Sequence, residues 1–343
     1  MSQLRDIQAC VEGQVPYDLP VFALSQEFDA RYAGLTYAEY LRDAETLVRT
    51  QELVVDRFGW DWCWLHLDDT LEFEPLGVGV AASENVVPAT ASYLAFARRV
   101  LRRLTVPDPQ RDGRMPLLLE ALAGLRASRG EKTCITGRVA APFSAVTLMF
   151  GMAEACLTMQ DNRRLFRDAL RFTEEAAISY GLAQIEAGAH AIWLGDCNAS
   201  THLISLDTYR EWALAPCQRV AAAFKDAGAW VFLHNSEETV AGLRAQAETE
   251  PSILSVGPGL DMAKARNALP DQPLMGNLDP LRLLQRGSAS QVAAETDRLV
   301  RVAAGGGMIL NSGECVPRDA KRPNLHTMVD TAKKIWNIAH ARV

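Results

Sequence analysis

The sequence predicts a single (β/α)8 barrel over residues 1–343, with an extra helical and loop insertion after its second strand. Two observations lead to this fold class. Apolar runs of strand length occur eight times between turn residues, and the intervals between them carry helical patterns. Strands that are apolar throughout and alternate with helices are typical of a parallel sheet. The runs comprise residues 19–25, 62–67, 132–136, 191–194, 230–233, 253–256, 273–275 and 308–310.

The helical interval 36–58 follows the first strand. It opens with Thr36 and Glu39, whose spacing is that of a capping box, in which each side chain accepts a hydrogen bond from the other residue's backbone N–H. After the second strand, the interval 70–131 is much longer than one crossover connection. It predicts extra helices and a loop beside the mouth of the barrel.

The later intervals predict one long helix each. The segment 161–187 is amphipathic and is followed by Gly188, a residue that commonly ends helices. A serine precedes the segment 206–227 and a glycine follows it, as expected for the two ends of a helix. The segments 289–304 and 324–342 complete the pattern.

Two domains of about 150 residues each would also account for 343 residues. However, no second compositional block divides the chain. A doubly wound open sheet is the structural alternative, but no G-x-G-x-x-G motif follows the early strands. A single barrel is therefore the simplest architecture that accounts for 343 residues.

Composition narrows the class of protein further. A hydrophobic share of 48% with 22% charged residues is ordinary for a globular chain, and the net charge of −7 disfavours binding to nucleic acid. The longest uncharged stretch, 139–153, is shorter than the roughly 20 residues of a membrane span. The first residues lack the apolar core of a signal peptide, and the seven cysteines form no C-x-x-C pair. We therefore expect a cytoplasmic protein that does not enter the membrane.

Barrel enzymes place their active sites at the carboxyl ends of the strands, so the residues that follow the strands are the candidates. These candidates are Glu27, Asp68, Asp69, Gly137, Arg138, Asp196, Cys197, His234, the segment 257–259, Asn277, Asp279, Glu314 and Cys315.

Each candidate also has a purely structural interpretation. A lone histidine such as His234 is often hydrogen-bonded scaffold, unless other metal ligands converge on it. Asp196 and Asp68 could cap the helices that follow them, and for Asp279, before Pro280, the cap is the better interpretation. Glu314 and Cys315 place a carboxylate beside a thiol in a glycine-rich loop, and this pattern favours a functional site over core packing. His66, His190, His326 and His340 are expected to be surface or core residues.

These strand-end segments resemble the uroporphyrinogen decarboxylase superfamily, and within it the cobamide-dependent methyltransferase branch. The resemblance extends from about residue 58 to the C-terminus. The motifs that carry it are Gly-Ala-His-Ala-Ile-Trp-Leu-Gly-Asp (188–196), Lys-Asp-Ala-Gly-Ala-Trp-Val-Phe-Leu-His (225–234), Met-Gly-Asn-Leu-Asp-Pro (275–280) and Gly-Gly-Met-Ile-Leu-Asn-Ser-Gly-Glu-Cys-Val-Pro (306–317).

The decarboxylase branch fits less well. Its N-terminal signature implies closely spaced arginines that bind the carboxylates of a tetrapyrrole, because guanidinium groups bind carboxylates in a bidentate manner. The matching stretch here, 24–32, contains acidic residues and only Arg31. Either Asp68 or Asp69 matches the aspartate that this family uses on pyrrole N–H groups.

In the methyltransferase branch, the resemblance implies zinc held by an H-x-C motif after the fifth strand and by a cysteine after the eighth. His234 matches the histidine, but Ser236 stands at the first cysteine position. Glu314 and Cys315 stand in the reverse of the family's Cys-Glu order. We expect His234 and Glu314 to bind the metal, with Cys315 or Glu237 as a further ligand. Such a donor set is harder than a thiolate site and suits polarising an oxygen leaving group.

The resemblance therefore implies a methyltransferase that demethylates a small O-methyl compound, such as a methoxylated aromatic, and passes the methyl group to cob(I)alamin. Asp196, Asp68 and Asn277 are expected to orient the substrate. The chain has no D-x-H-x-x-G motif to bind a corrinoid, so a partner corrinoid protein is expected to supply it. Aromatic residues could line an aromatic-substrate pocket, although core packing is the stronger interpretation for most of Trp60, Trp62, Trp64, Phe143, Phe150 and Trp193.

Several alternatives stay open. The same barrel could transfer a methyl group from methylcobalamin to a thiol, or decarboxylate a substrate. If the metal has been lost, Glu314 or Asp196 could serve as a proton donor instead. A metal-free binding protein without enzymatic activity is the alternative from another functional class. The oligomeric state is also open, and includes a homodimer.

Overall fold

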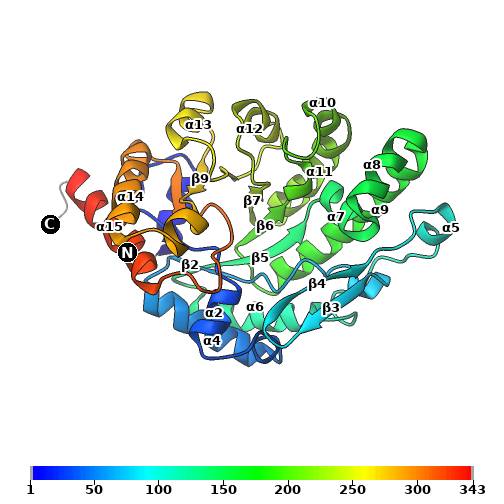
Figure 1. Ribbon diagram of the computed structural model, residues 1–343, viewed down its shortest axis with the longest axis horizontal. Helices are drawn as coiled ribbons and strands as arrows, with labels where there is room; N and C mark the ends of the chain where they lie inside the picture. The colour runs from blue at the N-terminus through cyan, green and yellow to red at the C-terminus, as the bar shows by residue number, and fades with distance from the viewer. Residues whose placement is uncertain (1–2, 341–343) are drawn as a thin grey trace.

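The structure, a computed structural model, describes residues 3–340. Its centre is a sheet of eight parallel strands in the order β1-β10-β9-β8-β7-β6-β5-β2. Figure 1 shows helices arranged around the outside of this sheet. The strands are β1 (Val21–Phe22), β2 (Trp62–Trp64), β5 (Cys134–Ala140), β6 (Ala191–Gly195), β7 (Trp230–His234), β8 (Ile253–Ser255), β9 (Leu274–Asn277) and β10 (Met308–Asn311).

Strands β1 and β2, at the two edges of the sheet, meet at Asp61. The Asp61 N–H donates to the Val21 carbonyl at 3.0 Å, and the Val21 N–H donates to Asp61 Oδ2 at 2.8 Å. These bonds bring the edges together into a nearly closed barrel, which confirms the predicted (β/α)8 fold. Each of the eight strands overlaps one of the apolar runs in the sequence.

The helices follow the predicted alternation, with additional short elements. The α-helices are α1 (Gln3–Val11), α2 (Glu27–Tyr32), α3 (Tyr37–Tyr40), α4 (Ala44–Phe58), α5 (Arg98–Leu101), α6 (Met115–Arg129), α7 (Pro142–Phe150), α8 (Met152–Asp161), α9 (Arg163–Glu186), α10 (Leu206–Thr208), α11 (Leu214–Asp226), α12 (Val240–Ala247), α13 (Met262–Ala268), α14 (Ala289–Ala303) and α15 (Arg322–Ala339). Turns of 3-10 helix cover Glu74–Leu76 and Cys197–Ala199, and π-helical turns cover Tyr209–Ala213 and Pro280–Gln285.

The helix predicted over 36–58 is two helices, α3 and α4. The capping box of Thr36 and Glu39 is present and begins α3. The chain then leaves the helical conformation at Asp43, whose side chain accepts a bond from the Thr46 N–H and begins α4. The second cap allows the chain to turn between the two helices.

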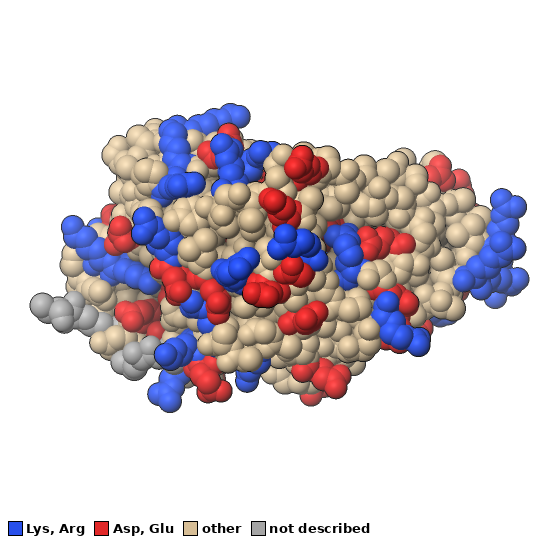
Figure 2. Space-filling model, turned by 90° about the horizontal axis from the view of Figure 1, so that it is seen from below, with Lys and Arg blue, Asp and Glu red and all other residues tan. Residues whose placement is uncertain are grey.

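The insertion after β2 contains an antiparallel hairpin, which the sequence did not indicate. Its strands are β3 (Gly79–Ser83) and β4 (Val86–Ser92). Their residues are mostly exposed and small. The two strands therefore lack the alternation of apolar and polar residues that predicts a strand from sequence. Helix α6 then provides the crossover to β5. Figure 1 shows the hairpin and α5 reaching away from the barrel, and Lys and Arg side chains gather at that end of the molecule (Figure 2).

The interior of the barrel is filled with aromatic side chains. Trp62 stacks on Phe232 with ring centroids 5.1 Å apart, and Trp64 packs edge-on against Trp193 at 5.7 Å. Trp60, Phe143 and Phe150 are buried as well. These residues pack in the core, as expected for large rings that bury extensive apolar surface, and Trp193 also packs against His234 with ring centroids 4.9 Å apart.

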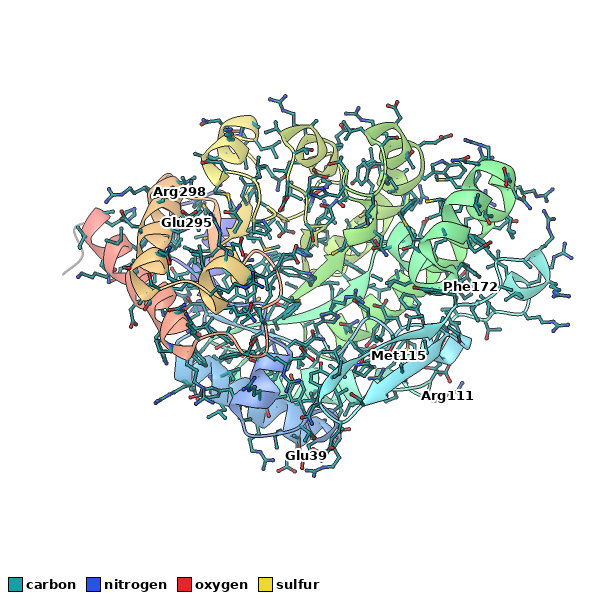
Figure 3. All side chains as sticks on the ribbon, in the orientation of Figure 1. Glu39, Arg111, Met115, Phe172, Glu295 and Arg298 are labelled. Atoms are coloured by element: carbon teal, nitrogen blue, oxygen red, sulfur yellow. The ribbon has the colours of Figure 1, made fainter. Side chains whose placement is uncertain are left out.

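The outer faces of the helices are polar. Arg298 and Glu295, for example, form an ion pair at 2.6 Å on the outside of α14 (Figure 3). Within residues 3–340, no single helix is long and apolar enough to cross a membrane. Helices α7 and α8 reach that length and composition only together, and they are bent by 110° where they meet.

Candidate functional site

His234 and Glu314 meet at the mouth of the barrel. His234 is the last residue of β7 and is 5% exposed. Its Nδ1 hydrogen-bonds Ser255 Oγ of β8 at 2.9 Å, and its Nε2 lies 3.5 Å from Glu314 Oε2. The ring is therefore held through one nitrogen while the other faces the carboxylate. Such an arrangement orients a histidine toward a ligand.

The loop after β10 directs Glu314 toward this histidine. The Gly313 N–H donates to Asn311 Oδ1 at 2.8 Å, and Ser312 Oγ donates to the Glu314 carbonyl at 2.8 Å. Gly313 has φ +69°, and a Cβ there would lie 3.2 Å from the backbone of Asn277. Glycine is required at this position because a side chain would be strained and would press on the neighbouring strand.

Charges in the site favour an ion pair. Burial by itself lowers the pKa of His234, but Cys197 and Glu314 beside the ring outweigh it and raise the pKa to about 10. Burial raises the pKa of Glu314, but the neighbouring His234 outweighs this effect, so the net pKa is below its usual value. Glu314 Oε1 has no hydrogen-bond partner within residues 3–340. The carboxylate therefore has acceptor capacity to spare.

Cys197 adds a sulfur to this site. Ser236 Oγ donates to Cys197 Sγ at 3.7 Å, and the cysteine is exposed. Ser236 itself has φ +58°, an uncommon conformation for a residue with a side chain. The sequence placed Cys197 directly after a strand but gave no reason to pair it with His234. The contact depends on the pairing of β6 with β7, in which Gly195 is in register with His234.

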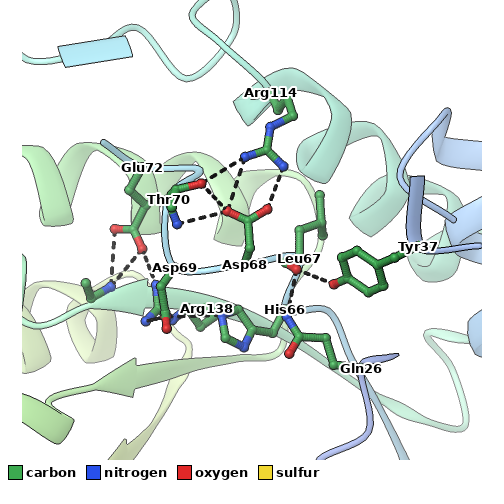
Figure 4. A network of polar contacts seen from close by, with 11 residues as sticks. Gln26, Tyr37, His66, Leu67, Asp68, Asp69, Thr70, Glu72, Arg114 and Arg138 are labelled. Carbon is green, nitrogen blue, oxygen red and sulfur yellow. Dashed lines mark hydrogen bonds and ion pairs between the residues drawn. The ribbon is translucent and has the colours of Figure 1, made fainter. Parts of the chain in front are cut away.

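The two aspartates after β2 have different environments (Figure 4). Asp68 is fully engaged, because Arg114 donates to its Oδ2 at 2.5 Å and its Oδ1 at 3.1 Å, and Thr70 donates to Oδ1 as well. Burial opposes ionisation of Asp68, but Arg114 keeps its pKa below the usual value. The structure thus gives Asp68 an ion pair that holds the insertion, whereas the sequence led us to expect a substrate contact.

Asp69 faces the mouth instead. It forms an ion pair with Arg138 and lies 3.4 Å from His66 Nε2. The Arg138 guanidinium holds the pKa of Asp69 well below its usual range, against the opposing effect of burial. Because Asp69 is more exposed than Asp68, it is the better candidate for contact with a ligand.

Glu237 is not available as a metal ligand. Its oxygens accept bonds from the Thr201 and Thr239 backbone N–H groups and hydroxyls, at 2.6 to 2.9 Å. It is completely buried and stabilises the turns beside α12. The sequence could not separate it from Glu314, because both are acidic residues close after a strand.

In both Asp196 and Asn277, one polar side-chain atom is hydrogen-bonded and the other has no partner within residues 3–340. Asp196 Oδ1 accepts from Ser144 Oγ at 2.8 Å, while Oδ2 has no partner within residues 3–340, and burial raises the pKa to about 7. Asn277 Nδ2 donates to the carbonyls of Gly257 and Leu260 at 2.8 and 2.6 Å. Its Oδ1 has no partner in the same range. Both residues lie at strand ends, as expected.

Cys315 is exposed in the same loop as Glu314. The surrounding protein and the charge of Glu314 raise the pKa of its thiol. A thiolate, the form that binds metal, is therefore disfavoured at Cys315 in the absence of a cation.

The site fits a zinc ion only in part. Donor atoms on one tetrahedral zinc lie roughly 3.5 Å apart, given Zn–ligand distances of about 2.0–2.3 Å. The 3.5 Å between His234 Nε2 and Glu314 Oε2 matches this spacing. Among residues 3–340, however, no group of three or more His, Cys, Asp or Glu side chains is arranged to hold a metal. Two ligands are in place and a third is not.

Comparison with known proteins agrees with the barrel and its motifs. Methylcobamide:CoM methyltransferase MtbA of Methanosarcina acetivorans is 26% identical over 302 residues, which cover 88% of each chain. Uroporphyrinogen decarboxylase of Erythrobacter litoralis is 25% identical over 328 residues, covering 90% of this chain and 89% of that protein.

A solved structure, a methyltransferase from Methanosarcina mazei, has a TM-score of 0.90 at 21% identity. It covers 98% of this chain and is itself covered to 99%, which supports the single barrel. The family model described as uroporphyrinogen decarboxylase (URO-D) matches residues 3–335. The chain therefore belongs to the uroporphyrinogen decarboxylase family, as its motifs indicated.

Proposed function

We propose that this chain is a corrinoid-dependent methyltransferase that demethylates a small O-methyl compound, such as a methoxylated aromatic. The observation that carries the proposal is the pairing of His234 with Glu314 at the mouth of the barrel. Proteins that this chain resembles include methylcobamide:CoM methyltransferases, which supports corrinoid chemistry. The methyl group would pass to cob(I)alamin carried by a partner corrinoid protein that docks over the mouth.

His234 and Glu314 would hold the zinc ion, and Cys315, in the same loop as Glu314, would have to change position to become the third protein ligand. When bound, zinc would supply a Lewis acid that polarises the ether oxygen of the substrate. Ser255 keeps His234 Nδ1 occupied, so that Nε2 is the nitrogen that faces the ligand. A carboxylate ligand in place of a thiolate favours an oxygen leaving group over a sulfur nucleophile.

The other residues would bind and orient. Asp196, with a pKa of about 7, can hold a proton near neutral pH for transfer to a departing oxygen. Asn277 Oδ1, which has no partner within residues 3–340, would accept from a substrate donor. Asp68 would act at a distance, because it fixes the insertion through Arg114.

A second candidate reaction is methyl transfer from methylcobalamin to a thiol. Cys197 favours it, because its sulfur lies beside His234 and makes the site softer than the sequence indicates. Decarboxylation of a tetrapyrrole remains disfavoured by the missing arginines in 24–32. A binding protein without activity is the remaining alternative.

The decisive experiment offers the purified chain cob(I)alamin and a panel of methoxylated compounds, and follows the corrinoid spectrum. We expect formation of methylcobalamin with at least one compound and its loss in His234→Ala. A parallel reaction contains methylcobalamin and a thiol. Consumption of methylcobalamin in that reaction alone would establish the second candidate and refute the first. Zinc content of the same preparations, measured by atomic emission, tests the metal, and substoichiometric zinc in an active preparation would refute it.

A further inference from the structure

Two buried asparagine side chains at the mouth each have one amide atom without a partner in the described part of the chain. Asn277, at the end of β9, is 4% exposed, and Asn311, at the end of β10, is completely buried. Asn277 Oδ1 and Asn311 Nδ2 have no hydrogen-bond partner within residues 3–340. Leaving a buried polar atom unpaired costs about 1–3 kcal/mol, so two on neighbouring strands require an explanation.

The backbone determines which atom of each amide is free. Asn311 Oδ1 accepts from the Gly313 N–H at 2.8 Å, and Asn277 Nδ2 donates to the carbonyls of Gly257 and Leu260. If the Asn311 amide were turned around, its NH2 group would face the Gly313 N–H, which is also a donor. If the Asn277 amide were turned around, its oxygen would face two carbonyl oxygens, which are also acceptors. The free pair is therefore one acceptor, on Asn277, and one donor, on Asn311.

Both side chains face the inside of the barrel. Asn311 is in register with Asn277 on one side and with Phe22 on the other. Phe22 packs against Trp193, from β6, inside the barrel, with ring centroids 6.3 Å apart. Residues in register on neighbouring parallel strands share a face of the sheet. Asn277 and Asn311 thus face the interior together with Phe22.

The pair also adjoins the catalytic candidates. Asn311 precedes Glu314 by three residues, and the loop between them packs on Asn277 at Gly313. Ser255, which hydrogen-bonds His234, is in register with Met275 on β9. Asn277 follows Met275 by two residues, so the amides form the next inward-facing layer above that of His234.

We propose that Asn277 and Asn311 form an amide pair that binds a neutral hydroxyl group of the ligand. The hydroxyl donates its hydrogen to Asn277 Oδ1 and accepts from Asn311 Nδ2. A carboxylate fits poorly, because it has no hydrogen for Asn277 Oδ1 and would lie near the Glu314 carboxylate. The inference rests on the proposed function, and with it the ligand is a methoxy compound that carries a hydroxyl group beside the methoxy group.

Binding measurements test the pair without requiring methyl transfer. The probes are 2-methoxyphenol and 1,2-dimethoxybenzene, which differ in having or lacking the hydroxyl hydrogen. We expect the wild-type chain, titrated calorimetrically, to bind 2-methoxyphenol about tenfold more tightly or better, because the analogue leaves Asn277 Oδ1 unpaired. Equal affinities, or binding of neither probe, would overturn the inference.

Asn311→Ser assigns the preference to this pair. A serine hydroxyl can still accept from the N–H two residues on, so the Gly313 bond is retained while the free amide donor is removed. We expect the preference for 2-methoxyphenol to fall at least about threefold. The matched control is Asn235→Ser, since Asn235, directly after β7, is also buried and has amide atoms without a partner within residues 3–340, but lies on neither β9 nor β10.

The control is expected to leave the preference unchanged within about twofold. An unchanged preference in Asn311→Ser, or an equal fall in both variants, would overturn the assignment. If the preference behaves as expected but none of the methoxy compounds is demethylated, the amide pair stands and the proposed function fails.

Discussion

Asp68 and Glu314 are both carboxylates beyond a barrel strand with a basic partner, yet they differ in what remains free. Arg114 and Thr70 occupy both oxygens of Asp68, whose side chain is fully buried. Glu314 has one oxygen 3.5 Å from His234 and another without a partner among the described residues. Its side chain is 32% exposed.

The difference separates a carboxylate whose oxygens are both engaged from one that keeps an oxygen without a partner among the described residues. A buried carboxylate with every lone pair engaged contributes to stability and offers nothing to a ligand. A carboxylate with an unengaged oxygen at the mouth of the barrel can bind a cation or a substrate. Sequence position alone made the two residues look alike, and their partners distinguish them.

The largest expected effect is the loss of activity in Glu314→Gln. The variant keeps the shape of the side chain but removes the charge that faces His234, so we expect methyl transfer to fall about 10²-fold or more. The corrinoid assay measures the rate. Thermal unfolding should shift little, because Glu314 is partly exposed and incompletely bonded. Full activity would show that Glu314 belongs with Asp68 among the structural carboxylates.

Asp68→Ala should show the opposite behaviour. Arg114 would lose its buried partner and the insertion would lose its anchor, so we expect the free energy of unfolding to fall by about 3 kcal/mol. Urea denaturation measures this change. The control is Asp56→Ala, which breaks the exposed ion pair with Arg129 and should cost less than about 1 kcal/mol. Equal losses in the two variants would contradict the structural role of Asp68.

Asp29 shows what happens to a buried carboxyl group without a cation. One oxygen accepts from Gln51 at 2.8 Å, the other has no partner in residues 3–340, and burial raises the pKa from 3.8 to about 7. The folded protein therefore holds this proton more tightly than the unfolded chain, and stability falls as the pH rises from about 4 to 7.

Asp29→Asn should remove this part of the pH dependence. Above pH 7 the variant should be more stable than the wild type by roughly 1–3 kcal/mol, and near pH 4 the two should agree, because both side chains are then neutral. Urea denaturation at several pH values tests the sign. A wild type that is more stable than the variant at pH 8 would contradict it.

The smallest expected effect concerns a local bond that involves neither carboxylate. Thr36→Ala removes the side chain that accepts from the Glu39 N–H at the start of α3. We expect a loss of about 1 kcal/mol in the free energy of unfolding, with methyl transfer unchanged. A larger loss than that of Asp68→Ala would mean that the ion pair with Arg114 contributes less than its burial indicates.

Much of the fold could be predicted because its signals are local. The apolar runs located the strands, and the capping box at Thr36 was present as expected. The β3–β4 hairpin was missed because its exposed small residues carry no periodic signal. The division of 36–58 was missed because Asp43 caps a second helix within an otherwise continuous stripe.

The strand-end positions of the candidate residues were predictable, but their hydrogen-bond and ion-pair partners were not. His234, Glu314, Asn277 and Asp196 do lie at strand ends, and the family motifs pointed to them. Whether Asp68 or Asp69 faces the mouth depends on Arg114 and Arg138, which come from distant segments. The same holds for Glu237 and Glu314, since Thr201 and Thr239 engage only the former.

The sequence by itself determined the barrel, the family and the residue types at the strand ends, because periodicity and motifs are properties of neighbouring residues. Only the tertiary structure decided which of those residues keep a free atom. Hydrogen bonds across the barrel engage Asp68 and Glu237 completely and leave Glu314, Asn277 and Asn311 with capacity for a ligand. The bonds of Arg114 to Asp68 and of Thr201 to Glu237 join residues 46 and 36 positions apart in the sequence, and no local pattern records them.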